Sequence, residues 1–248
     1  MRRRTISRAI ASLLTAALTL TACTTGTKPA PHPRSSSAKT PATALAAAAN
    51  RLKADSFTMT MTVKIDTTDA VVVGAMDAAK KAGAFTVTTT RNGATSINEW
   101  RILGGTVYRK SEAASAPRNA TRPWRRINQA DAPALAASFD GATMAGPLTR
   151  ATGVQRTSDT HFTGSLTTTA VVDALSLPTP ATSANTSLAP TVAFTADLDE
   201  QGRLIRYHLD IPRRNGTTYP LELTYAKFGQ DVSVQPPPAD EISGAPGL

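Results

Sequence analysis

The sequence predicts an α+β protein built on a strongly curved antiparallel sheet, a half-barrel of about 8–11 strands with helices packed on its concave face. Segments in which apolar and polar residues alternate recur along most of the chain, as in half-buried strands. Turns rich in Gly, Asn and Asp separate many of them, which favours antiparallel neighbours. Helix-like segments stand at the start and in the middle of the chain rather than between successive strands.

The clearest strand covers residues 56–65, where five apolar residues alternate with Thr and Lys. Such alternation places the apolar side chains on one face of a strand and the polar ones on the other. Further strands are expected around the turns Asn92-Gly93 and Gly104-Gly105 and again in the last third of the chain. Their expected ranges are 84–90, 96–103, 106–110, 123–127, 161–166, 191–197, 204–211 and 219–225, followed by a last strand through Val232 and Val234.

The first helix is expected at residues 42–54, which are rich in Ala. Leu45 and Leu52 are seven residues apart and therefore share one helix face. Thr40 is a suitable N-cap, and Pro41 suits the first helical position.

Two further helices are expected, at 131–144 with Asp131 as N-cap and at 169–177. Residues 69–82 are ambiguous. Three valines at their start favour a strand, whereas the Ala and Lys residues that follow favour a helix. The sequence predicts a short helix there.

The first 22 residues have the pattern of a secretory signal peptide. Four arginines precede an apolar run at residues 9–20, which is shorter than the roughly 20 residues that span a bilayer. The run ends in Leu20-Thr21-Ala22-Cys23. This sequence resembles the bacterial lipobox, in which the cysteine receives a diacylglyceryl group and signal peptidase II cleaves just before it. A cysteine buried in an ordinary apolar helix is the alternative.

The chain accordingly divides into four expected parts. They are a lipoprotein signal peptide at 1–22, a lipidated N-terminus with a flexible tether at 23–41, a folded domain at 42–236 and a polar tail at 237–248. The tether contains four prolines and many Ser and Thr residues. Two acyl chains, at about 0.8 kcal/mol per buried methylene, would hold such a protein stably on the extracytoplasmic face of the cell membrane.

The formal net charge is +9, and removal of the four leader arginines leaves +5. The remaining charge is spread over the chain, which suits an anionic lipid surface better than nucleic acid, and we expect no nucleic-acid partner. The single cysteine excludes a disulfide within the chain.

Nothing in the sequence points to an enzyme. The three histidines are His32 in the tether, His161, which is more readily explained as structural, and His208, which should face solvent. The sequence contains no H-E-x-x-H, G-x-S-x-G or Gly-rich phosphate loop. We therefore expect no catalytic residues, no metal site and no cofactor.

Several short motifs resemble the actinobacterial LppX/LprAFG lipoproteins, which share a half-barrel fold with the LolA and LolB carriers. They are TVYRK at 106–110, PWRRI at 123–127, THFTG at 160–164, DEQGRL at 199–204, and the end of the domain from Phe228-Gly229 to Pro236-Pro237. The resemblance implies an apolar cavity that binds acylated lipids or lipoprotein acyl chains. It transfers no catalytic residues and no defined cavity lining.

Two groups of residues are candidates for lipid contact. Eight apolar residues on expected strands would line the cavity, with ordinary core packing as the alternative. They are Phe57, Met59, Met61, Val63, Phe85, Val87, Val192 and Phe194. A basic group would touch phosphates at the membrane surface, with a solvated hairpin as the alternative. It consists of Arg122, Trp124, Arg125 and Arg126.

The function expected from these observations is that of a membrane-anchored lipoprotein that binds or carries lipid or acylated molecules at the cell envelope. A surface-tethered interaction or sensor module without lipid cargo is the alternative. The sequence identifies neither the ligand nor a protein partner.

Overall fold

A computed structural model of the chain describes residues 40–113, 123–175, 189–212 and 218–243. All of them belong to one compact unit, Lys39–Leu248. The predicted signal peptide, Cys23 and nearly all of the predicted tether lie outside the described residues.

The described residues form one mostly antiparallel sheet of twelve strands, one more than the upper expected number. The strands are β1 (Ser56–Ile65), β2 (Thr68–Asp77), β3 (Ala82–Arg91), β4 (Ala94–Leu103), β5 (Thr106–Ala113), β6 (Trp124–Arg126), β7 (Thr152–Arg156), β8 (His161–Thr167), β9 (Thr191–Leu198), β10 (Leu204–Pro212), β11 (Thr218–Ala226) and β12 (Ile242–Ser243). Their spatial order is β12-β6-β5-β4-β3-β2-β1-β11-β10-β9-β8-β7. The sheet is therefore open, with edges at β12 and β7, and only the β12–β6 pair is parallel.

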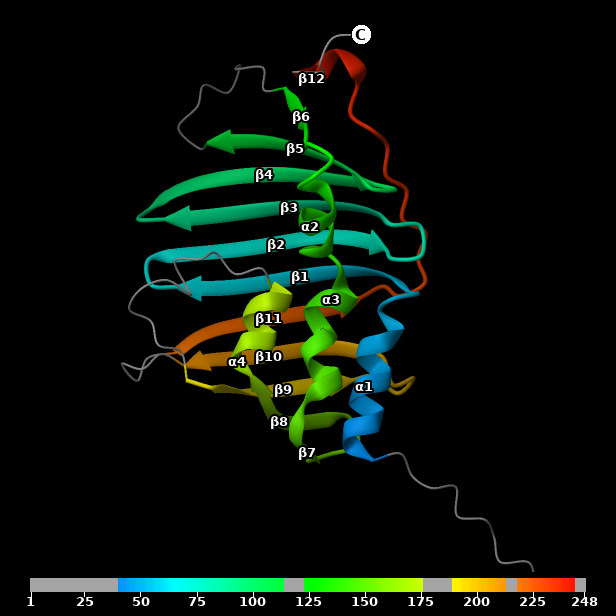
Figure 1. Cartoon of the computed structure of the whole chain (residues 1–248), viewed down its shortest axis with the longest axis vertical. Coiled ribbons are helices and arrows are strands. Elements are labelled where there is room, and N and C mark those ends of the chain that lie inside the picture. Colours follow the sequence, from blue (N-terminus) through cyan, green and yellow to red (C-terminus); the bar gives the residue numbers. More distant parts are fainter. Residues whose placement is uncertain (1–39, 114–122, 176–188, 213–217, 244–248) are drawn as a thin grey trace, which may run out of the picture. The chain divides into compact units, whose positions relative to one another are not determined.

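The helices are few and short. They are α1 (Pro41–Arg51), α2 (Ala132–Ala137), α3 (Gly141–Ala145), the 3-10 turn η1 (Gly146–Arg150), α4 (Thr168–Leu175) and the 3-10 turn η2 (Ala239–Glu241). In Figure 1, α1 to α4 all lie in front of the same face of the sheet. The start of α1 is as expected, because the Thr40 hydroxyl accepts the Thr43 N–H at 3.2 Å and Pro41 follows it.

We name the two faces of the sheet by their contacts. The helix-side face carries Phe57, which contacts Gly141 of α3, and Phe85, whose ring stacks on Phe139 just before α3 at 4.8 Å. The opposite face is the outer face. Directly opposed residues of paired strands lie on the same face, so the register assigns each strand residue to one of the two.

The expected helix at 69–82 is wrong. Residues Thr68–Asp77 form β2, which pairs along its whole length with both β1 and β3. The helix-forming residues Ala78 to Lys81 make only one turn, in which the Lys81 N–H bonds to the Ala78 carbonyl. Ten residues of β2, each paired with a neighbouring strand on both sides, outweigh a helix preference of a few tenths of a kcal/mol per residue.

The expected helix at 131–144 is two helices. Asp140 interrupts it and caps α3, because its carboxylate accepts the N–H groups of Ala142 and Thr143. Asp131 stands before α2 but makes no capping bond, and its carboxylate instead accepts the Asn128 side-chain amide at 2.6 Å.

The end of the chain also differs from expectation. Residues 231–235 form no strand. Polar contacts hold this segment instead, among them Lys80 to Asp231 and Arg101 to the Gln235 carbonyl. The sheet then continues into β12, within the stretch expected to be a polar tail.

Candidate functional site

The candidate site is a part of the helix-side face where burial is incomplete. One row of opposed residues crosses the sheet from β9 to β1 through Phe194, Leu209, Leu221 and Val63. The first three are buried, at 3%, 0% and 0% exposure, whereas Val63 is only partly buried. In this row, therefore, the complete cover ends between β11 and β1.

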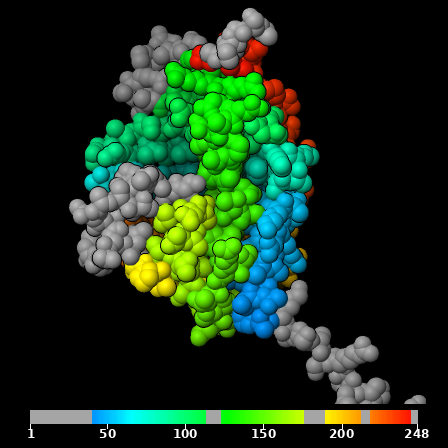
Figure 2. Space-filling view, in the orientation of Figure 1, coloured from blue at the N-terminus to red at the C-terminus, as the bar shows by residue number. Residues whose placement is uncertain are grey.

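Beyond this boundary several apolar residues of β1, β3 and β4 stay partly buried, although Val72 of β2, directly opposed to both Met61 and Val87, is only 3% exposed. We call these partly buried residues the open strip, which consists of Met61, Val63, Ile65, Val87 and Trp100. Met61, Val63, Ile65 and Val87 lie toward the β1–β2 and β3–β4 turns, away from the buried row of Phe57 and Met76. Trp100 lies in the row next to that buried row, opposed to buried Phe85, and its ring centre is 5.4 Å from that of Phe139. In Figure 2, atoms in the colours of β2 to β4 reach the surface beside the column of helices.

The eight predicted lining residues fall into two sets. Five are at most 3% exposed and belong to the packed core, namely Phe57, Met59, Phe85, Val192 and Phe194. Three belong to the open strip, namely Met61, Val63 and Val87. All eight lie on the helix-side face, and the sequence alone could not separate the two sets, because both alternate in the same way.

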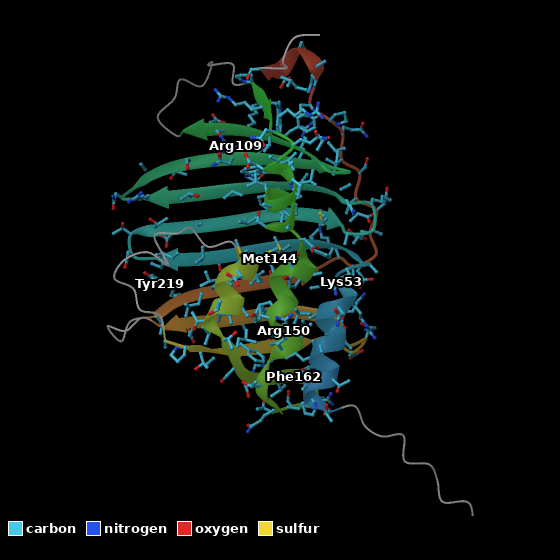
Figure 3. All side chains as sticks on the ribbon, in the orientation of Figure 1. Lys53, Arg109, Met144, Arg150, Phe162 and Tyr219 are labelled. Atoms are coloured by element: carbon cyan, nitrogen blue, oxygen red, sulfur yellow. The ribbon has the colours of Figure 1, made fainter. Side chains whose placement is uncertain are left out.

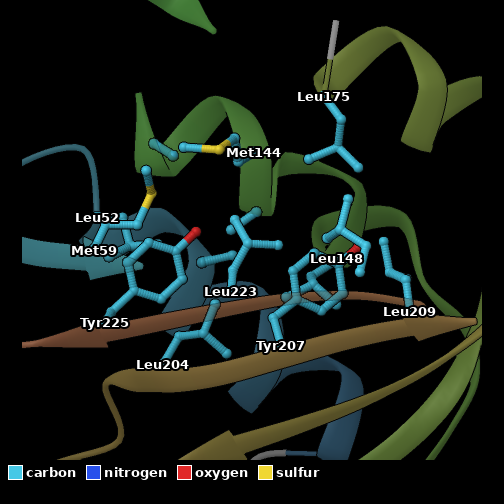
Figure 4. Close-up of a cluster of buried hydrophobic side chains, with 14 of the residues drawn as sticks. Leu52, Met59, Met144, Leu148, Leu175, Leu204, Tyr207, Leu209, Leu223 and Tyr225 are labelled. Carbon is cyan, nitrogen blue, oxygen red and sulfur yellow. The ribbon is translucent and has the colours of Figure 1, made fainter. Parts of the chain in front are cut away.

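Two buried tyrosines add polar atoms to the covered part. Tyr207 and Tyr225 are 0% and 2% exposed, and neither hydroxyl has a hydrogen-bond partner among the described residues. Figure 4 shows both rings rising from β10 and β11 toward α3 and η1. Burial away from water raises the pKa of both phenols, and the Asp140 carboxylate adds to the effect at Tyr225. Both groups are therefore neutral hydroxyls without a hydrogen-bond partner among the described residues.

A cationic group borders the open strip on β5 and β6, and it was not identified from the sequence as a set. Arg109 is opposed to Arg125 on one side and to Trp100 on the other, so all three lie on the helix-side face. The Arg109 guanidinium lies 5.6 Å from the centre of the Trp100 ring, and Figure 3 labels this arginine on β5. A pocket of about 420 Å³ is lined by Arg109, Ser111, Pro123 and Arg125.

The predicted membrane-contact group is divided between the two faces. Trp124 is 2% exposed and lies below Arg101 and Lys110 on the outer side of the sheet, so its ring does not reach the surface. Arg125 and Arg126 are exposed and lie on opposite faces of β6. Arg122 lies outside the described residues. Contact of the exposed arginines with a membrane stays a prediction.

The outer face carries an ionic network. His161 Nδ1 lies 2.5 Å from Asp197, and Arg206 bonds Glu222 at 2.6 Å. His208 is partly buried rather than solvent-facing, and its Nε2 lies 3.4 Å from Asp210. Across residues 40–113, 123–175, 189–212 and 218–243, no group of three or more His, Cys, Asp or Glu residues is arranged to hold a metal. Hydrogen bonds and ion pairs between neighbouring strands account for this network.

No helix in the described part of the chain is long and apolar enough to cross a membrane.

Comparison with known proteins assigns no family. No family model matches the chain, and no curated protein matches it. Among solved structures, the chain is similar to a DUF1329 family protein from Desulfovibrio piger, with 9% sequence identity and a TM-score of 0.22. The match covers 77% of this chain and 92% of the other. The resemblance to the LppX/LprAFG lipoproteins thus rests on the sequence motifs.

Proposed function

We propose that this chain is a lipid-anchored envelope protein that binds or carries lipids or other acylated molecules on the helix-side face of its sheet. The observation that carries the proposal is the change in burial between Leu221 and Val63, where the cover over one row of the apolar face becomes incomplete. An acyl chain lying on the open strip would remove that apolar surface from water at about 25 cal/mol per Å².

The N-terminal part of the sequence supports the same proposal. A lipobox at Cys23 would hold the domain close to a bilayer, where acylated molecules are concentrated. In this view the sheet is a curved half-barrel like that of the carriers whose motifs the sequence resembles, with its helices in the concave side. The open strip is then the entrance of a binding groove between them.

Adaptable residues on the strip fit a variable hydrocarbon ligand. Met61 is flexible and polarisable, and β-branched Val63 and Val87 offer a smooth apolar surface beside it. Ala70 and Thr89 continue the row of Val63 across the same face with small side chains. A chain of methylenes needs this kind of surface, because it makes no directional bonds.

Native mass spectrometry tests the proposal. The full chain is expressed in an actinobacterial host, released from membranes in a mild detergent, and weighed with any lipid that stays bound. We expect an acyl lipid on the wild-type protein. Val87→Asp should reduce its occupancy at least tenfold, because it places a charge on the open strip.

The matched control is Val73→Asp. Val73 is 51% exposed and lies on the outer face of β2, the strand next to β3, so the same substitution there should leave occupancy unchanged. Absence of bound lipid from the wild-type protein, or equal loss in both variants, would favour a tethered interaction or sensor module without lipid cargo.

A further inference from the structure

The acidic side chains of the described strands all lie on the outer face of the sheet. Seven carboxylates lie on described strands, and the register places every one of them on the outer face. They are Asp69, Asp77, Glu99, Glu112, Asp197, Asp210 and Glu222. Arg109 and Arg125 lie on the other face, beside the open strip.

These two arginines are directly opposed across β5 and β6. Like charges in that arrangement repel each other, because directly opposed Cβ atoms are only about 5 Å apart. Neither guanidinium forms an ion pair with a described residue, whereas outer-face Arg206 lies between Asp197 and Glu222. A pair of unneutralised arginines that lines a pocket of about 420 Å³ is suited to an anion that contacts both.

The polar groups around the pocket leave the two arginines as its charged donors. The Ser111 side chain borders the pocket, and its hydroxyl donates to Asn98 on the neighbouring strand at 2.7 Å. The Trp100 indole N–H is buried and has no hydrogen-bond partner among the described residues. Trp100 and Arg109 are opposed neighbours, so the cationic site and the apolar strip are continuous.

We infer that Arg109 and Arg125 bind the negatively charged headgroup of an acyl lipid whose hydrocarbon chain lies along the open strip. The inference rests on the proposed function and adds the class of ligand, an anionic amphiphile rather than a neutral or cationic one. The guanidinium pair holds the phosphate or carboxylate oxygens, while Val87 and Met61 contact the chain. Charge at one end and hydrocarbon at the other also fix the direction of the bound lipid.

Photo-crosslinking tests the inference on the full chain in isolated membranes. Two probes are used, a palmitate analogue and the matching hexadecanol analogue, both with a diazirine near the end of the chain. The labelled peptides are identified by mass spectrometry. We expect the palmitate analogue to label β1 and β3, at least fivefold more than the alcohol.

The variants separate charge from packing. Arg109→Gln with Arg125→Gln should lower palmitate labelling at least fivefold and leave alcohol labelling unchanged. Arg109→Lys with Arg125→Lys should keep most of the palmitate labelling. Arg126→Gln, on the outer face of the same strand, is the matched control and should behave as wild type. Melting temperatures of the purified variants confirm that each is folded.

Two outcomes would overturn the inference in different ways. Equal labelling of the open strip by both probes, insensitive to the arginine substitutions, would remove the headgroup site and leave the proposed function intact. No labelling of the open strip by either probe would remove both.

Discussion

Val63 and Leu221 are directly opposed across β1 and β11 and share the helix-side face, yet Leu221 is fully buried and Val63 is not. Both residues are aliphatic, and both stand in strands with the same alternating pattern. Their difference arises from what lies over them, because the residues of this row are buried from β9 to β11 and only partly buried at β1. The predictions below test the packing of the covered part and the accessibility of the open part.

The contact between α3 and the sheet depends on Gly141. A Cβ atom at this position would lie 2.5 Å from Phe57 Cζ and 3.2 Å from Tyr225 Cε1. Gly141→Ala should therefore lower the free energy of unfolding by about 1–3 kcal/mol. Gly146→Ala is the control, since its Cβ would meet nothing within 4 Å, and it should be neutral or slightly stabilising. Equal effects in urea unfolding would show that α3 does not pack as described.

The strands of this sheet were largely predictable from the sequence. Alternation located β1, β3, β4 and β9 to β11. The turn between β3 and β4 has the positive φ values that Asn-Gly turns require, 50° at Asn92 and 79° at Gly93. These features are local, so a local pattern could identify them.

Features that depend on distant partners were not predictable. Gly74 on β2 is opposed to Phe85 on β3, and a Cβ atom at Gly74 would lie 2.3 Å from the Phe85 ring. This close pairing with β3 belongs to a strand, whereas the Ala and Lys residues that follow favour a helix when the sequence is considered locally. The pairing of Arg109 with Arg125 requires knowing that β5 and β6 are neighbours across residues 114–122. The division of the eight apolar residues into core and open strip depends on where the helices end, which alternation does not encode.

Asp77 should make stability depend on pH. Its carboxylate accepts the Lys80 N–H and lies 3.0 Å from Lys80 Nζ, and the backbone bond chiefly lowers its pKa below the ordinary value of 3.8. Because the pKa of this carboxyl is lower in the folded state than in the unfolded state, its ionised form stabilises the folded protein at pH values above the unfolded-state pKa. This stabilisation is lost as the pH falls through the folded-state pKa. Asp77→Asn should cost about 1 kcal/mol at pH 7.

The test is urea unfolding of both proteins from pH 7 to pH 2. The difference between Asp77→Asn and wild type should begin to shrink as the pH falls to about 4 and be smallest at the acid end. Asp159→Asn, at an exposed position in the turn before β8, should differ from wild type by less than about 0.5 kcal/mol throughout. A pH-independent difference for Asp77→Asn would exclude the carboxylate as its cause.

Removal of a buried tyrosine hydroxyl is expected not to lower the free energy of unfolding, unlike the substitutions at Gly141 and Asp77. Tyr225→Phe removes a hydroxyl that is buried without a described partner, so unfolding free energy should stay the same or rise by up to about 1 kcal/mol. Tyr207→Phe should behave alike. A loss of more than about 1 kcal/mol in either variant would mean that the hydroxyl is bonded in solution, for example to water.

The membrane anchor is tested at Cys23. Cys23→Ala removes the sulfur that the lipobox pattern predicts to carry the lipid. We expect the variant to be released from membranes or to accumulate as the uncleaved precursor, as read from its mass and from cell fractionation. A variant with the wild-type mass that remained in the membrane fraction would contradict the lipobox interpretation.

The most direct test uses Trp100, which belongs to the open strip. The chain has two tryptophans, so Trp124→Phe leaves Trp100 as the sole reporter, and Trp100→Phe leaves buried Trp124 as the control. Palmitate brominated along its chain is added to each, and the fluorescence is compared with that after unbrominated palmitate. The account predicts saturable quenching of Trp100 and none of Trp124. Equal quenching of both, or none of Trp100, would show that no acyl chain lies on the open strip.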